Sequence, residues 1–118
     1  MKTAAQQMGR KAEELAIRYF TRQGFAIMAR NYRYQRAEID IIAKKNHLLV
    51  FVEVKARSND QFGHPEAFVT PKQQALVRAA AEHYIIAQDW NYAIRFDIIA
   101  ILQQNSNHPQ LTHFEDAF

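Results

Sequence analysis

Three residues near the middle of the sequence, Asp40, Glu53 and Lys55, have types and spacing that suit metal-assisted chemistry. Glu53 and Lys55 are two positions apart in a stretch rich in β-branched residues, so on a strand they share one face, about 6.6 to 6.8 Å apart. Two carboxylates that face each other across paired strands have Cβ atoms about 4.5 to 5.5 Å apart and can hold one cation. Without a cation, the two carboxylates would repel each other.

The segments 38–43 and 48–57 predict two antiparallel strands joined by a polar turn at 44–47. Period-two alternation places Ile39 and Ile41 together on one face of the first strand. On the second strand it predicts one apolar and one mixed face, made respectively by Val50, Val52, Val54 and Ala56 and by Phe51, Glu53, Lys55 and Arg57. A four-residue loop, 45–48, would set Asp40 opposite Glu53, whereas a two-residue loop would set it opposite Phe51.

Carboxylate oxygens and water are the ligands that Mg²⁺ prefers, and Mg²⁺ keeps waters while it also meets a phosphate. Such a metal acidifies a bound water and neutralises charge on a phosphodiester oxygen. Lys55 beside it could orient that water or stabilise the pentacovalent transition state. The alternative is that Asp40, Glu53 and Lys55 form the polar side of a half-exposed hairpin, with Lys55 paired to an acid. The spacing alone leaves both interpretations open.

Two helices and further strands must position these residues. Apolar residues recur at helical spacing up to residue 20, which predicts a helix from about residue 4 or 9 to 22, and Thr3 with Gln6 forms a capping-box pattern. Thr70, Pro71 and Gln73 predict the start of a second helix that ends near residue 88. Segments 25–34, 92–102 and 111–114 predict strands, and 58–69 and 103–110 predict loops. We expect one α/β domain over residues 1–118, with a mixed central β-sheet flanked by two helices in the order αβββαβ, with or without a short final strand.

The composition excludes several classes of protein. The chain of 118 residues has 48% hydrophobic residues, 23% charged residues and no Cys, so it can form a packed core but no disulfide or thiolate metal site. It has no glycine-rich phosphate loop, and its five His residues lack the spacing of a helical metal site. No apolar stretch approaches the ~20 residues of a membrane helix, and the first residues lack the apolar core of a secretory signal. We expect a soluble, cytoplasmic protein with no membrane partner.

The positive charge is concentrated at the start of the sequence. Residues 1–36 contain eight Lys or Arg against two Glu, whereas residues 37–118 contain seven basic and ten acidic residues. A basic segment beside a more acidic remainder is typical of a surface that binds a polyanion, most commonly nucleic acid. The alternative is a solvated helix face.

Six blocks along nearly the whole chain resemble the YraN-like bacterial proteins, uncharacterised protein family 0102. The blocks are Gly9-Arg10-Lys11-Ala12-Glu13, Asn31-Tyr32-Arg33, Ala37-Glu38-Ile39-Asp40-Ile41-Ile42, Phe51-Val52-Glu53-Val54-Lys55-Ala56-Arg57, Phe62-Gly63 and Arg95-Phe96-Asp97. Ala37 departs from the pattern, because the family usually has Gly before Glu-Ile-Asp, and Ala narrows the backbone conformations open to this turn.

That family is similar in turn to the PD-(D/E)xK nuclease superfamily, especially archaeal Holliday junction resolvases. The resemblance implies a restriction-endonuclease-like fold and a Mg²⁺ (or Mn²⁺) site formed by Glu13, Asp40 and Glu53, with Lys55 as the fourth catalytic residue. It implies a nucleic-acid-binding protein with Mg²⁺-dependent endonuclease activity on structured or branched DNA. The alternative is a non-catalytic module that binds nucleic acid or protein through a residual nuclease-like site. Homodimerisation follows only by analogy with the resolvases.

Basic residues near these acids are candidates for phosphate contacts, namely Arg10, Arg33, Arg36, Arg57 and Lys72. Lys72 is expected in the first turn of a helix, where the helix dipole disfavours a cation unless an anion binds there. Tyr32 and Tyr34, interleaved with arginines, could stack on bases, or they could be half-buried strand residues.

Overall fold

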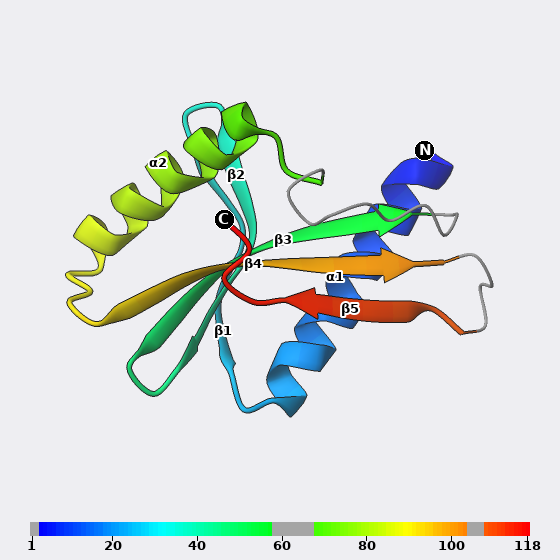
Figure 1. The fold of residues 1–118 in the computed structure, drawn as a ribbon, viewed down its shortest axis with the longest axis horizontal. Coiled ribbons are helices and arrows are strands. Elements are labelled where there is room, and N and C mark those ends of the chain that lie inside the picture. The colour runs from blue at the N-terminus through cyan, green and yellow to red at the C-terminus, as the bar shows by residue number, and fades with distance from the viewer. Residues whose placement is uncertain (1–2, 58–67, 104–107) are drawn as a thin grey trace.

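The computed structural model describes residues 3–57, 68–103 and 108–118, and its elements follow the predicted order (Figure 1). The elements are α1 (Ala4–Arg22), β1 (Ala26–Tyr34), β2 (Ala37–Lys45), β3 (Leu48–Arg57), α2 (Pro71–Ala87), β4 (Ala93–Leu102) and β5 (Gln110–Phe114). Most of the loop predicted at 58–69, and the centre of the loop predicted at 103–110, lie outside the described residues. The mixed α/β class and the short final strand are confirmed.

Both helices begin with the capping boxes that the sequence predicts. The Thr3 hydroxyl accepts a hydrogen bond from the Gln6 amide, and the Gln6 side chain accepts one from the Thr3 amide. Thr70 and Gln73 repeat the arrangement at the start of α2, with Pro71 in its first turn. Each box satisfies backbone donors that the first helical turn leaves free, which fixes where the helix begins.

The five strands form one sheet in the order β1-β2-β3-β4-β5. Only the pair β3 and β4 is parallel, and α2 makes the crossover between them, as a parallel connection requires. The two helices cover opposite faces of the sheet (Figure 1). Buried α2 residues pack on Phe51 and Phe96, whereas buried α1 residues pack on Val50 and Val52, so β3 shows the predicted alternation.

Strand β2 breaks the predicted alternation. Ile39 packs in the core under α2 and Ile41 in the core under α1, so the prediction that they share a face is wrong. The neighbouring strand explains the change, because Asn31 of β1 has a left-handed backbone with φ 51° between the paired residues Arg30 and Tyr32. The regular strand pairing is interrupted at the level of Asn31 and Asp40, and the buried residues of β2 change faces at this level.

The hairpin of β2 and β3 has a two-residue turn, Asn46 and His47, and its pairing runs from Lys45 with Leu48 to Ile41 with Val52. The next opposed positions are Asp40 and Glu53. The expectation that a two-residue loop would set Asp40 opposite Phe51 is wrong. That pairing requires a turn at residues 45–46, whereas the observed turn lies one residue later, at 46–47.

Ala37 has no positive φ. Gln35 in the preceding turn has the left-handed conformation instead, with φ 54°, so Ala is accommodated at the position where the family usually has Gly.

No helix within the described ranges is long and apolar enough to cross a membrane.

Candidate functional site

Asp40 lies where β2 separates from β3. The regular pairing of the two strands ends at Ile41 and Val52. Beyond it, the Asp40 carboxylate accepts a hydrogen bond from the Val54 backbone amide at 2.8 Å. A side chain thus takes the place of a strand-to-strand hydrogen bond, because a buried amide left without a partner is costly. This hydrogen bond holds the Asp40 side chain beside β3, at the level of Glu53.

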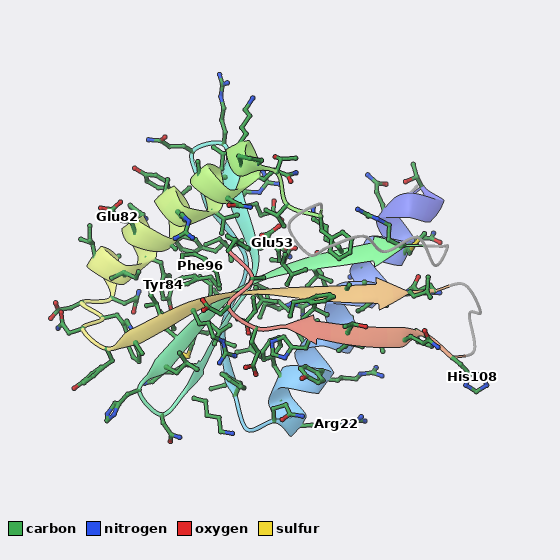
Figure 2. All side chains as sticks on the ribbon, in the orientation of Figure 1. Arg22, Glu53, Glu82, Tyr84, Phe96 and His108 are labelled. Atoms are coloured by element: carbon green, nitrogen blue, oxygen red, sulfur yellow. The ribbon has the colours of Figure 1, made fainter. Side chains whose placement is uncertain are left out.

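Glu53 is the unusual member of the pair. It lies between β3 and the start of α2 (Figure 2), and its Oε1 atom is buried without a hydrogen-bond partner among the described residues. Burial first, and then the charge of Asp40, raises the pKa of Glu53 to about 8. Burial also raises the pKa of Asp40 to about 6, against the opposing hydrogen bond from Val54. The pair therefore holds a proton near neutral pH that a cation could replace.

Lys55 follows Glu53 on the same face of β3. Its positive charge lowers the pKa of both Asp40 and Glu53. In the described part of the chain, no ion pair within 4.0 Å joins Lys55 to either carboxylate. The ammonium group is thus near the acids but is not neutralised by contact with them, which disfavours the simple salt-bridge interpretation.

Glu13 approaches the same site from α1. Burial raises the pKa of Glu13, and the negative charge of Glu38 also raises it. The negative charge of Glu13 in turn raises the pKa of Asp40. When the side-chain amide of Asn31 is oriented with its nitrogen toward the acids, this nitrogen lies 3.1 Å from Glu13 Oε1 and 3.0 Å from Glu38 Oε1. Asp40 therefore interacts electrostatically with both Glu13 and Lys55, and two residues that were not predicted, Asn31 and Glu38, also contact or influence these acids.

The residues meet one requirement of a divalent-metal site and leave another incomplete. Asp40 and Glu53 supply hard oxygen ligands, and one oxygen is buried with no partner in the described residues; this donor set fits Mg²⁺ or Mn²⁺. Within the described ranges, however, no three His, Asp or Glu side chains are grouped closely enough to hold a metal ion. A metal bound by Asp40 and Glu53 would need water to complete its coordination, and Glu13 could meet that water while its Oε1 atom accepts a hydrogen bond from Asn31.

Two openings on the surface flank this site. Glu13 lines a pocket of about 740 Å³ together with Arg10, Arg30 and Arg33. Glu53 lines a smaller pocket of about 190 Å³, where Arg36 faces residues of the first turns of α2. Three of the five predicted phosphate-binding residues thus line the openings to the acids.

The two remaining candidates for phosphate contacts are Arg57 on β3 and Lys72 on α2. The Arg57 guanidinium stands 5.9 Å from the centre of the Phe68 ring and donates to the carbonyl of Ala56. Lys72 is exposed in the first turn of α2, next to Gln73, which lines the smaller pocket. Either side chain could meet a phosphate only at the margin of the site.

Tyr32 and Tyr34 are half-buried strand residues, which was the second of the two interpretations. The Tyr32 hydroxyl is 2.7 Å from His83 Nδ1, and its ring meets the edge of Tyr84. Tyr34 stacks on His83 with ring centres 4.3 Å apart. Their rings therefore attach the β1–β2 hairpin to α2.

The fold and site together define a mixed α/β protein with a half-buried acidic pair and a lysine at the point where the two strands of a β-hairpin separate. The chain belongs to the Uncharacterised protein family UPF0102, whose model matches residues 12–101. It is 44% identical to a UPF0102 protein of Christiangramia forsetii over 112 aligned residues, and the alignment covers 95% of this chain and 93% of the relative. It is also 41% identical to a UPF0102 protein of Chlorobium phaeobacteroides, with 100% and 98% of the two chains covered.

Proposed function

We propose that this protein binds nucleic acid and is a Mg²⁺-dependent endonuclease that hydrolyses phosphodiester bonds of structured or branched DNA. The observation that carries the proposal is the half-buried pair of Asp40 and Glu53 beside Lys55, in which one buried Glu53 oxygen has no partner among the described residues. Burying two acids without a neutralising partner costs free energy, and such perturbed groups are concentrated at functional sites. A similar pattern of acids and lysine in the PD-(D/E)xK nucleases supports the same reaction class.

Glu13, Asp40 and Glu53 would hold the metal, which when bound supplies an acidified water and neutralises charge on the scissile phosphate. Lys55 orients the attacking water and stabilises the charge that develops on the phosphate oxygens. The water oxygen bonds to phosphorus as the bond to the leaving sugar oxygen breaks. Asp40 is kept in place for this step by its hydrogen bond from Val54.

The arginines around the two openings support nucleic acid as the substrate. Arg10 and Arg33 lie beside Glu13, and Arg36 lies beside Glu53, so basic groups flank the acids on both sides. A phosphodiester chain that crosses the site could place phosphates against both groups. Arg57 and Lys72 would extend these contacts toward α2.

A second candidate is a non-catalytic module that binds nucleic acid or protein. It is favoured by one observation: within the described ranges, no three acidic side chains are assembled into a metal site. In that case the acids would be remnants of a catalytic centre and the basic surface alone would act.

Incubation of the purified protein with branched, duplex and single-stranded DNA, in the presence of Mg²⁺, Mn²⁺ or a chelator, tests the proposal. We expect metal-dependent cleavage that Asp40→Asn abolishes while DNA binding is retained. Binding without cleavage of any of the three DNAs with either metal would contradict the enzyme and favour the binding module.

A further inference from the structure

Asn31 occupies a position in the site that neither the acids nor the arginines explain. It lies on β1, yet its side chain lies between Glu13 on α1 and Glu38 on β2. A side-chain amide has two N–H groups, so one nitrogen can donate to both carboxylates, at 3.1 and 3.0 Å. This single group therefore connects three elements of the fold.

The backbone at this position also calls for Asn. The φ of Asn31 is 51°, in the left-handed region that Gly and Asn adopt most readily. Glycine would fit the backbone but has no amide to donate, and Asp would present a carboxylate to two others. Asn combines this backbone conformation with a short side chain that carries N–H donors.

The contact matters because Glu13 and Glu38 repel each other. Another contact between α1 and β1 is an ion pair between Glu14 and Arg30 at 2.6 Å, whose side chains are 45% and 44% exposed. Exposed pairs of this kind hold geometry weakly. Glu38 also contacts Arg33 at 3.0 Å, but that arginine side chain is 79% exposed.

We infer that Asn31 is a positioning residue of the acidic site, whose amide holds Glu13 and Glu38 in a fixed relation to each other and to Asp40. The inference rests on the proposed metal site for its consequence, which is that Asn31 sets the metal affinity without being a ligand. Groups that orient metal ligands commonly change affinity by about 10- to 100-fold when they are removed.

The test is Asn31→Gly, which keeps the left-handed backbone and removes the amide. Asn46→Gly is the matched control, since Asn46 has φ 54° in the turn between β2 and β3. We expect Mn²⁺ affinity, measured by calorimetry, to fall about 10-fold or more in the first variant and to stay unchanged in the second. Equal Mn²⁺ affinity of Asn31→Gly and wild type would overturn the inference.

A second measurement separates this inference from the proposed function. In urea unfolding, Asn31→Gly, Glu13→Ala and the double variant form a cycle, and we expect the double variant to lose less stability than the sum of the two single variants. Additive losses of stability would contradict the contact between Asn31 and Glu13. Wild-type protein that binds no Mn²⁺ would overturn the proposed metal site, and the cycle would still decide whether the amide holds Glu13.

Discussion

Two carboxylates in this sheet, the buried Asp97 and the half-buried Glu53, have opposite environments. Asp97 of β4 is fully buried and accepts two hydrogen bonds from Arg95 and one from the Asp116 amide, with His113 Nε2 2.6 Å away. Burial alone would raise the pKa of Asp97, but the hydrogen bonds from His113, Arg95 and Asp116 hold it below its usual value. Glu53, in contrast, has a raised pKa and an oxygen without a partner in the described part of the chain.

The contrast separates a structural acid from a functional one. Because Asp97 is ionised and accepts only, His113 Nε2 must carry the proton toward it, and His113 Nδ1 lies 2.8 Å from the Tyr19 hydroxyl. This network ties β5 and the C-terminal residues to β4 and α1. The charges of this network are balanced within the protein, whereas we propose that a bound divalent cation balances those of Asp40 and Glu53.

The largest effect expected is the removal of the structural acid. Asp97→Ala leaves Arg95 and His113 without their shared partner, so the free energy of unfolding should fall by about 3–5 kcal/mol. Urea unfolding measures the change. Glu82→Ala, on the exposed face of α2 (Figure 2), is the control and should stay within about 0.5 kcal/mol of wild type. A similarly small change for Asp97→Ala would show that the network is not structural.

Lys55→Met should lower the cleavage rate ~10²-fold or more with little change in DNA affinity, because the ammonium group acts on the transition state. Single-turnover kinetics and a binding titration measure the two quantities. Lys11→Met, exposed on α1, is the control. A Lys55→Met rate within tenfold of wild type would assign the lysine to surface pairing.

Glu53→Gln should stabilise the metal-free protein at pH 8 by about 1–2 kcal/mol. The folded-state pKa of Glu53 is raised from 4.5 to about 8, so its favourable contribution is complete below pH 4.5 and is lost as the pH rises through 8. Chelator-treated wild type should therefore lose stability between these pH values relative to the variant. Parallel pH profiles would contradict the raised pKa.

The smallest effect concerns the salt dependence of DNA binding. Replacing Arg10, Arg33 and Arg36 by Ala should flatten the log-log slope by about 0.9 for each phosphate that the variant no longer neutralises. Lys11, Arg18 and Arg22 form a control set with equal charge on α1, and Arg22 lies far from Glu53 (Figure 2). An equal slope change in both sets would show that the site-proximal arginines bind no better than the rest of the surface.

Local signals predicted much of the fold and only part of the site. The Thr70 capping box predicted the start of α2, and the Thr3 box indicated the earlier of the two starts that the sequence left open for α1. The change of face between Ile39 and Ile41 was missed, since it depends on the backbone of Asn31 in the neighbouring strand. Asn31 within the predicted strand 25–34 was the available signal, as Asn tolerates positive φ.

Residues that meet through the tertiary fold left weaker signals. Asp97 holds both its strand neighbour Arg95 and the backbone amide of Asp116. Its contact with His113 was not predicted, because 16 positions and another strand separate them. Glu38 alternates with Asp40 in the sequence, but only the fold brings it to Glu13.

The central claim is that a divalent cation completes the charge balance of Asp40 and Glu53. Calorimetric titration of Mn²⁺ at pH 7, in two buffers with different ionisation enthalpies, measures binding and proton release together. We predict binding with release of a proton, because the raised pKa of Glu53 leaves it largely protonated before the metal binds. Asp40→Asn should remove this binding. Undiminished Mn²⁺ binding in that variant, or none in wild type, would contradict the claim.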